Sequence, residues 1–200
     1  SEAEEIISAQ LLELGIYWRA PGVIWNVWAR GAGGFASFDS VRQLIGPGLN
    51  RRNESDWNGY SLAVAAGAAY DYRMGRWSIR PEAIVEYFSL NEDAHEEAGG
   101  GDGFDLGFED RSGHIFSSTV AVTVGAGFGE NLWLRPEIRL GWRQIFSHDP
   151  GVTTARFLST GTPFDLQGNS IEGGGPVVGF RLNLGNELGF LAIEADAELM

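Results

Sequence analysis

The chain has 200 residues, with 29 glycines, 12% aromatic residues and no cysteine, and its 27 acidic against 14 basic residues give a net charge of −13. This composition excludes a disulfide scaffold and a cysteine-based zinc site, and the negative charge argues against a surface that binds nucleic-acid phosphates. No run of about 18 apolar residues predicts a membrane-spanning helix, and the opening SEAEEIISAQ lacks the basic start and apolar core of a signal peptide.

Apolar and polar residues alternate with a period of two in eight segments. Because successive side chains of a β-strand point to opposite faces, each segment predicts a strand with one apolar and one polar face. In chain order the predicted strands are 6–19, 23–38, 58–74, 76–90, 114–128, 132–146, 176–185 and 188–199. Their length of about 10 to 17 residues exceeds that of typical soluble strands and favours strands that cross a membrane.

The connections between these strands alternate between short and long. Short turns rich in Gly, Pro and Asn are expected at 20–22, 74–76, 129–131 and 185–187. Long loops are expected at 39–56, 91–113 and 148–174. Within the last loop, 152–166 also alternates, but one extra crossing would break the short–long order, so we interpret 148–174 as an external excursion that holds a hairpin. This order is typical of outer-membrane barrels, which have tight periplasmic turns and large external loops.

The strand count also bears on the ends of the chain. Eight crossings in this order would leave both termini on the external side, whereas outer-membrane barrels keep them in the periplasm. We therefore expect residues 1–200 to be a single barrel domain that is incomplete at both ends.

Charged residues occupy the polar faces of the predicted strands. A cationic side chain facing lipid at the midplane costs about 2–4 kcal/mol, so these residues are expected to face the lumen. They would keep the channel wet and grip a translocating segment, or they would pair with one another and stabilise the interior, which is the preferred interpretation. The predicted pore-lining residues are Arg30, Arg73, Arg80, Glu82, Glu86, Arg135, Glu137, Arg139, Arg143, Arg181, Glu194, Asp196 and Glu198.

Aromatic residues lie on the apolar faces, several of them near strand ends. Amphipathic rings prefer the headgroup level of a membrane, so these positions predict interfacial girdles; a carbohydrate-binding platform is the alternative. The predicted membrane-interface aromatics are Trp18, Trp25, Tyr60, Tyr70, Tyr72, Tyr87, Trp133 and Trp142.

The long loops hold the candidates for metal binding and catalysis. Eight acidic residues in 91–113 could bind calcium, but their spacing fits no EF-hand, so a solvated loop is favoured. These residues are Glu92, Asp93, Glu96, Glu97, Asp102, Asp105, Glu109 and Asp110. The histidines are His95, His114 and His148, and the serines near them are Ser112, Ser117 and Ser147. No nucleophile motif surrounds these serines, so we expect neither an enzyme nor a cofactor.

Several ordered blocks resemble the C-terminal translocator domain of autotransporters, the barrel of type V secretion. The blocks are SDWNGYSLAVAAGAAYDY, GRWSIRPEAIVEYFSL, EEAGGGDGFDLGFEDR, LWLRPEIRLGWRQIF, TTARF and IEGGGPVVGF, and the resemblance runs from about Trp25 to Leu199. It implies a twelve-stranded up-and-down barrel, of which roughly three strands would precede Glu5 and one would follow Met200. It also implies an N-terminal passenger, a linker helix in the pore and the help of the barrel-assembly machinery.

The sequence thus predicts an all-β, antiparallel transmembrane barrel in the bacterial outer membrane, in contact with lipid and not with nucleic acid. The leading hypothesis is a translocator that anchors and exports a passenger through its polar lumen. A structural barrel or scaffold subunit without a passenger is the alternative. A third hypothesis, a soluble barrel that holds a lipophilic ligand, inverts the two faces, and alternation alone does not say which face is inside.

Overall fold

The computed structural model describes residues 2–101, 103–186 and 189–198. Over this part of the chain the fold is nearly all antiparallel β, with a single 3-10 turn at Glu130–Leu132, which confirms the predicted fold class. All eight predicted strands are present. With the short β4, which continues β3, they form the main sheet: β1 (Glu2–Pro21), β2 (Trp25–Gly46), β3 (Leu49–Tyr70), β4 (Tyr72–Met74), β5 (Trp77–Glu92), β8 (Arg111–Ala126), β9 (Leu134–Asp149), β12 (Gly173–Asn186) and β13 (Gly189–Glu198).

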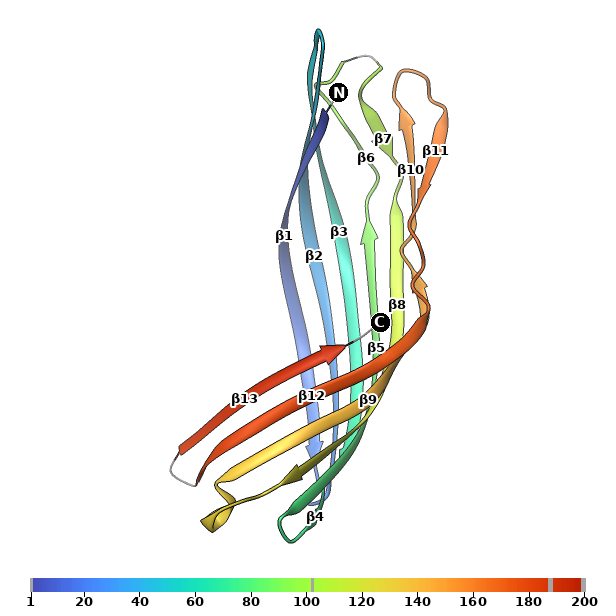
Figure 1. The fold of residues 1–200 in the computed structure, drawn as a ribbon. Coiled ribbons are helices and arrows are strands. Elements are labelled where there is room, and N and C mark those ends of the chain that lie inside the picture. Colours follow the sequence, from blue (N-terminus) through green and yellow to red (C-terminus); the bar gives the residue numbers. More distant parts are fainter. Residues whose placement is uncertain (1, 102, 187–188, 199–200) are drawn as a thin grey trace.

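The main sheet is a meander in which each strand pairs with the strand before it along this order. Its order is β1-β2-β3-β5-β8-β9-β12-β13, with β4 paired to β5. The sheet curls so that β9, β12 and β13 sweep across in front of β1 to β3, giving one concave and one convex face (Figure 1). In the described part of the chain β1 and β13 each pair on one side, so the sheet is open.

The short turns gather at one end of the sheet and the long connections at the other (Figure 1). We call these the turn end and the loop end. At the loop end the prediction of a long loop at 39–56 is wrong, because β2 and β3 continue there as a paired hairpin up to a turn at Pro47 and Gly48. Both faces of this extension carry polar residues, so the apolar alternation that revealed the other strands is missing there.

A second, smaller sheet stands at the loop end. Among the described residues it has the order β11-β10-β7-β6, with β6 at His95–Glu96, β7 at Leu106–Phe108, β10 at Val152–Phe157 and β11 at Pro163–Gln167. The β10–β11 pair confirms the hairpin expected within 148–174. Backbone hydrogen bonds in both directions between Glu54 and Ala98 attach this sheet to the β2–β3 extension. The segment 91–113 is therefore a folded insert and not a free loop.

Aromatic pairs mark the two limits of the apolar convex face on β2 and β3. Trp25 lies opposite Tyr70, and Phe35 lies opposite Tyr60, ten residues further along each strand. At about 3.3 Å per residue and a tilt of about 40°, ten residues span about 25 Å of depth, the height of the apolar band of an outer-membrane barrel. The convex positions between the pairs carry no charge: Val27, Ala29, Gly31 and Gly33 on β2, and Leu62, Val64, Ala66 and Ala68 on β3.

Strand β9 differs from the predicted strand 132–146 at both ends. It starts at Leu134, because Leu132 and Trp133 belong to the 3-10 turn and its C-cap. It also bulges, since Phe116 pairs with Ser147 while Ser117 pairs with Ile145, which leaves Phe146 as the extra residue. A bulge shifts the alternation by one position, so strict parity fails beyond it.

Among the described residues we find no helix with the length and apolar character needed to cross a membrane.

Candidate functional site

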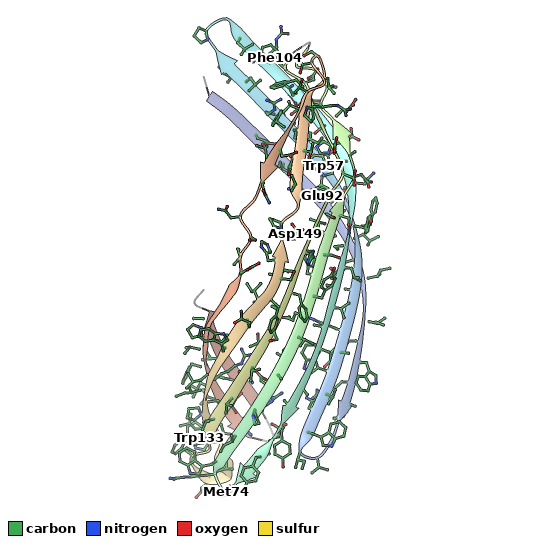
Figure 2. All side chains as sticks on the ribbon, turned by 90° about the vertical axis from the view of Figure 1, so that its right-hand side faces the viewer. Trp57, Met74, Glu92, Phe104, Trp133 and Asp149 are labelled. Atoms are coloured by element: carbon green, nitrogen blue, oxygen red, sulfur yellow. The ribbon has the colours of Figure 1, made fainter. Side chains whose placement is uncertain are left out.

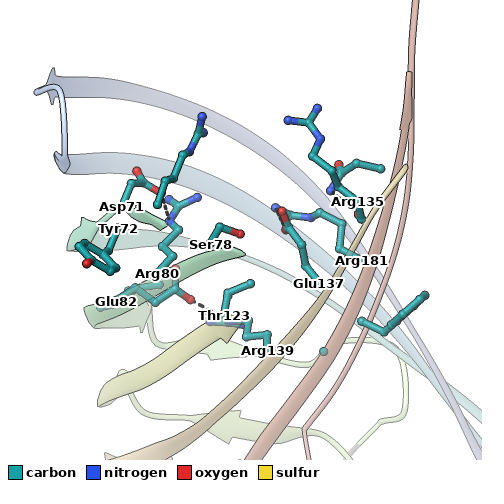
Figure 3. A pocket seen from close by; sticks show the side chains of 15 residues that line it. Asp71, Tyr72, Ser78, Arg80, Glu82, Thr123, Arg135, Glu137, Arg139 and Arg181 are labelled. Atoms are coloured by element: carbon teal, nitrogen blue, oxygen red, sulfur yellow. Dashed lines mark hydrogen bonds and ion pairs between the residues drawn. The ribbon is translucent and has the colours of Figure 1, made fainter. Parts of the chain in front are cut away.

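The concave face of the main sheet carries the charged residues that the sequence singled out. Ten of the thirteen predicted pore-lining residues line two pockets on this face. Arg73, Arg80, Glu82, Arg135, Glu137, Arg139 and Arg181 line a pocket of about 430 Å³ near the turn end (Figure 3), and Arg30, Glu86 and Arg143 line one of about 200 Å³. The side chains of Glu194, Asp196 and Glu198 on β13 lie outside the described residues.

Small residues on intervening strands let the long charged side chains reach one another. The Nε atom of Arg139 on β9 donates to Oε1 of Glu82 on β5 at 2.7 Å, across β8. At that level β8 carries Ala121 and Thr123, neither long enough to block the contact. Alternation of long charged and short residues from strand to strand thus places ion pairs between strands that share no backbone hydrogen bond.

The same arrangement joins three strands through one carboxylate. Arg30 on β2 donates to Glu86 on β5 at 3.2 Å, over the buried Ala65 of β3. The other oxygen of Glu86 lies 3.8 Å from Nη2 of Arg143 on β9. Glu86 therefore ties the β2–β3 hairpin to the β8–β9 hairpin.

Two further pairs lie toward the turn end. Arg181 lies 3.8 Å from Glu137, its direct neighbour on β9, and Arg80 lies 3.8 Å from Asp71. Asp71 is a residue of this wall that the predicted set omits, although it shares the alternation of Arg73. The concave face is thus a wall of opposite charges that contact one another.

The predicted interface aromatics are all exposed, and their exposed fractions range from 38% to 58%. The residues of this set are Trp18, Trp25, Tyr60, Tyr70, Tyr72, Tyr87, Trp133 and Trp142. Phe35 and Trp77 are exposed as well and were missed, although Phe35 lies directly opposite Tyr60. Trp133 lies at the turn end with Met74, as Figure 2 shows.

The acidic residues of 91–113 are not uniformly solvated, and for Glu97 that expectation is wrong. Glu97 is 5% exposed and accepts from Arg42 Nε at 2.8 Å, which raises the pKa of Arg42 against the opposing effect of burial. Glu92 pairs with Arg111, whose Nε lies 2.7 Å from its Oε2. No group of three His, Cys, Asp or Glu side chains in the described chain is placed to hold a metal ion, and Asp102 lies outside that part.

The histidines make separate contacts at the loop end. His95 stacks between Trp57 at 4.1 Å and Phe108 at 4.7 Å, and burial lowers its pKa. His114 Nε2 lies 2.9 Å from Ser147 Oγ, between neighbouring strands. His148 Nδ1 accepts from the backbone of Ile171 at 2.8 Å. A Ser–His hydrogen bond alone does not define a hydrolase, because that chemistry also needs a base-orienting group and oxyanion donors.

Long antiparallel strands with an apolar convex face and a charged concave face define a protein of the transmembrane β-barrel class. A family model described as the autotransporter beta-domain matches residues 7–195. The chain therefore belongs to the autotransporter β-domain family, whose members form translocator barrels of the bacterial outer membrane, and the predicted resemblance is confirmed. A search of curated protein sequences returned no match. The soluble-barrel hypothesis is inconsistent with this family.

Proposed function

We propose that the chain is the membrane wall of a translocator that anchors and exports an N-terminal passenger through a polar lumen. The charged concave face, on which ten Arg and Glu side chains line two pockets, carries this proposal. A polypeptide crossing lipid needs partners for its backbone and polar side chains, and such a wall supplies them. The passenger or its linker helix is the partner inside the lumen, and the barrel-assembly machinery is the partner during insertion.

The structure also supports an orientation. The uncharged band between the aromatic pairs matches the depth of a membrane, and the folded inserts stand beyond it at the loop end. In outer-membrane barrels the short turns face the periplasm and the long connections face outward. The loop end would then be the external side, and a passenger would leave the lumen there.

Export is tested on the full-length protein with an epitope placed on the N-terminal side of this domain. We expect protease added to intact cells to remove the epitope. A matched control carries Val122→Arg, which puts a cation on the convex face and should lower the amount of assembled barrel. An epitope that stays protected while the wild-type barrel is folded in the outer membrane would contradict passenger export.

A scaffold role is the second candidate, and the reciprocal ion pairs favour it. Glu82, Glu86 and Glu137 each contact an arginine of a neighbouring hairpin, so these charges also act as internal cross-links. In that case charge-neutral variants would lower barrel stability, and neither they nor the wild type would show export, because a scaffold carries no passenger.

A further inference from the structure

A small apolar pocket lies on the concave face, just beyond the charged wall. Phe88 and Leu90 follow Glu86 at steps of two residues along β5, so they share its face. Ile115 on β8 is the cross-strand partner of Phe88. Together with Pro150 these side chains line a pocket of about 190 Å³, which we call the apolar pocket. The charged wall therefore gives way to an apolar site at this depth.

The aromatic ring in this pocket is open to the lumen. Phe88 is 42% exposed, although β5 lies in the interior of the main sheet and not at an open edge. Its neighbours in the sheet are short: Ala63 is its partner on β3, and Leu90 lies between Ser61 and Gly113. Apolar surface that faces a wet lumen favours a partner that removes it from water.

The polar side chains that line the apolar pocket already have partners. Arg111 Nε donates to Glu92 Oε2 at 2.7 Å, and Arg111 Nη1 donates to Thr153 Oγ1 at 3.1 Å. Figure 2 shows Glu92 and Asp149, which both line the pocket, at the base of the loop end. The other polar lining residues with hydrogen-bond partners are His114, His148 and Asp149. Over the described residues the lining thus presents no unpaired side chain to a polar ligand, and an apolar group fits it best.

Size and position identify the kind of occupant. Pockets for small-molecule ligands measure about 300–1,000 Å³, so about 190 Å³ is too small for such a ligand and suits a single side chain. The concave face also points away from lipid, which excludes an acyl chain as the partner. The proposed function puts a polypeptide on this side of the wall, and that polypeptide can supply the side chain.

We propose that the apolar pocket binds an apolar side chain of the polypeptide segment that occupies the lumen, and so holds this segment at a fixed depth. The proposal rests on the proposed function, since it needs a segment inside the barrel. The charged wall solvates the polar groups of such a segment. The pocket begins two residues beyond Glu86 and selects an apolar residue at that level.

The test places the photoreactive residue p-benzoylphenylalanine at one of three positions of β5 in the full-length protein. Phe88 is in the apolar pocket, and Ser78, ten residues earlier on the same face, lines the large pocket of the charged wall. Ser89 is the control, because the residue after Phe88 lies on the convex face. Crosslinks to an epitope-tagged segment on the N-terminal side of this domain are read on gels. Heat-modifiable migration confirms that each variant is folded.

We expect crosslinks to the tagged segment from Phe88 and Ser78 and none from Ser89. A crosslink from Ser78 without one from Phe88 would overturn the apolar pocket and leave the proposed function intact. Absence of both would contradict the proposed function as well. A product at Phe88 that contains lipid or a second copy of the chain, and not the tagged segment, would also overturn the pocket.

A polar substitution tests the chemistry of the pocket. Ile115→Gln puts an amide without a partner into the lining, so it should lower the crosslink yield at Phe88 at least threefold and leave the yield at Ser78 unchanged. Ser112→Gln adds the same group on the convex face of the same strand and should leave both yields unchanged. An equal yield at Phe88 in the two variants would show that apolar contact does not hold the segment.

A second variant keeps the proposal testable if Ile115→Gln fails to fold. Pro150 lies between β9 and β10, outside the β-ladder, so Pro150→Gln changes the pocket without removing a strand residue. It should lower the yield at Phe88 in the same way. A yield equal to that of the wild type would refute the apolar pocket.

Discussion

A charge introduced on the convex face of β8 should destabilise the barrel strongly, while the same group one residue away should not. Val122 lies on the convex face, six residues from both Phe116 and Phe128, which are exposed on that face. Six residues of a tilted strand cover about 15 Å of depth, so Val122 sits near the middle of the membrane. The next residue, Thr123, lines the large inner pocket between its cross-strand partners Arg80 and Arg139.

The magnitude follows from these positions. An arginine at the midplane costs about 2–4 kcal/mol, so Val122→Arg should lower the folding equilibrium constant about 30- to 900-fold. A glutamate at Val122 should also destabilise, by less than arginine does. Thr123→Glu places a carboxylate between two arginines, and an opposite-charge cross-strand pair contributes about 0.2–1 kcal/mol, so this variant should be neutral or slightly stabilised.

Urea unfolding of the refolded protein in lipid vesicles, followed by tryptophan fluorescence, measures these differences. Val122→Glu and Thr123→Glu carry the same group on opposite faces, so they are the matched pair. If Thr123→Glu is the more damaging of the two, the assignment of the faces is reversed and the reasoning is refuted.

Three further outcomes are expected. Gly141→Ala should lower the free energy of unfolding in urea titrations by about 1–3 kcal/mol, because the new Cβ would lie 2.6 Å from Ala121 Cβ and from the carbonyl oxygen of Val120. Gly31→Ala is the control and should be neutral, because no atom lies within 4 Å of the Cβ it would add. Equal effects of the two substitutions would contradict the close packing of β8 on β9. Glu82→Gln should lose about 1–2 kcal/mol with its bond to Arg139, and an unchanged urea midpoint would show that the pair contributes nothing. Burial lowers the pKa of His95, so the packing of the insert against the β2–β3 extension should be most stable above pH 6.5 and should weaken as the pH falls below that value. Hydrogen exchange of the insert, corrected for intrinsic rates, should therefore speed up at low pH in the wild type and not in His95→Phe.

The alternation of apolar and polar residues was enough to predict the strands of the main sheet and the charged residues of its concave face. Arg139 and Glu82 could both be assigned to the polar face because charge cannot face lipid. Their contact could not be predicted, since it crosses β8 and depends on register and on the small Ala121. Sequence alternation specifies which face a residue occupies and leaves open which residue it meets.

The loop end was harder to predict for a physical reason. Outside lipid both faces of a strand meet water or polar groups, so the β2–β3 extension lacks a two-face pattern and looks like a loop. The burial of Glu97 depends on Arg42, 55 residues earlier, and no local feature of the acidic insert shows that pairing. The bulge at Phe146 likewise arises from pairing with β8 and leaves no mark in β9 alone.

The central claim is that the apolar face of the sheet meets lipid and the charged face lines a wet lumen. The most direct measurement is a nitroxide scan of the cysteine-free protein in lipid vesicles, one label at a time from Leu134 to Arg143, comparing collisions with oxygen and with a water-soluble nickel chelate. We predict a period of two, with oxygen contact highest at Leu134, Ile138, Leu140 and Trp142, and nickel contact highest at Arg135, Glu137, Arg139 and Arg143. The opposite phase, or the absence of a period, would contradict the claim.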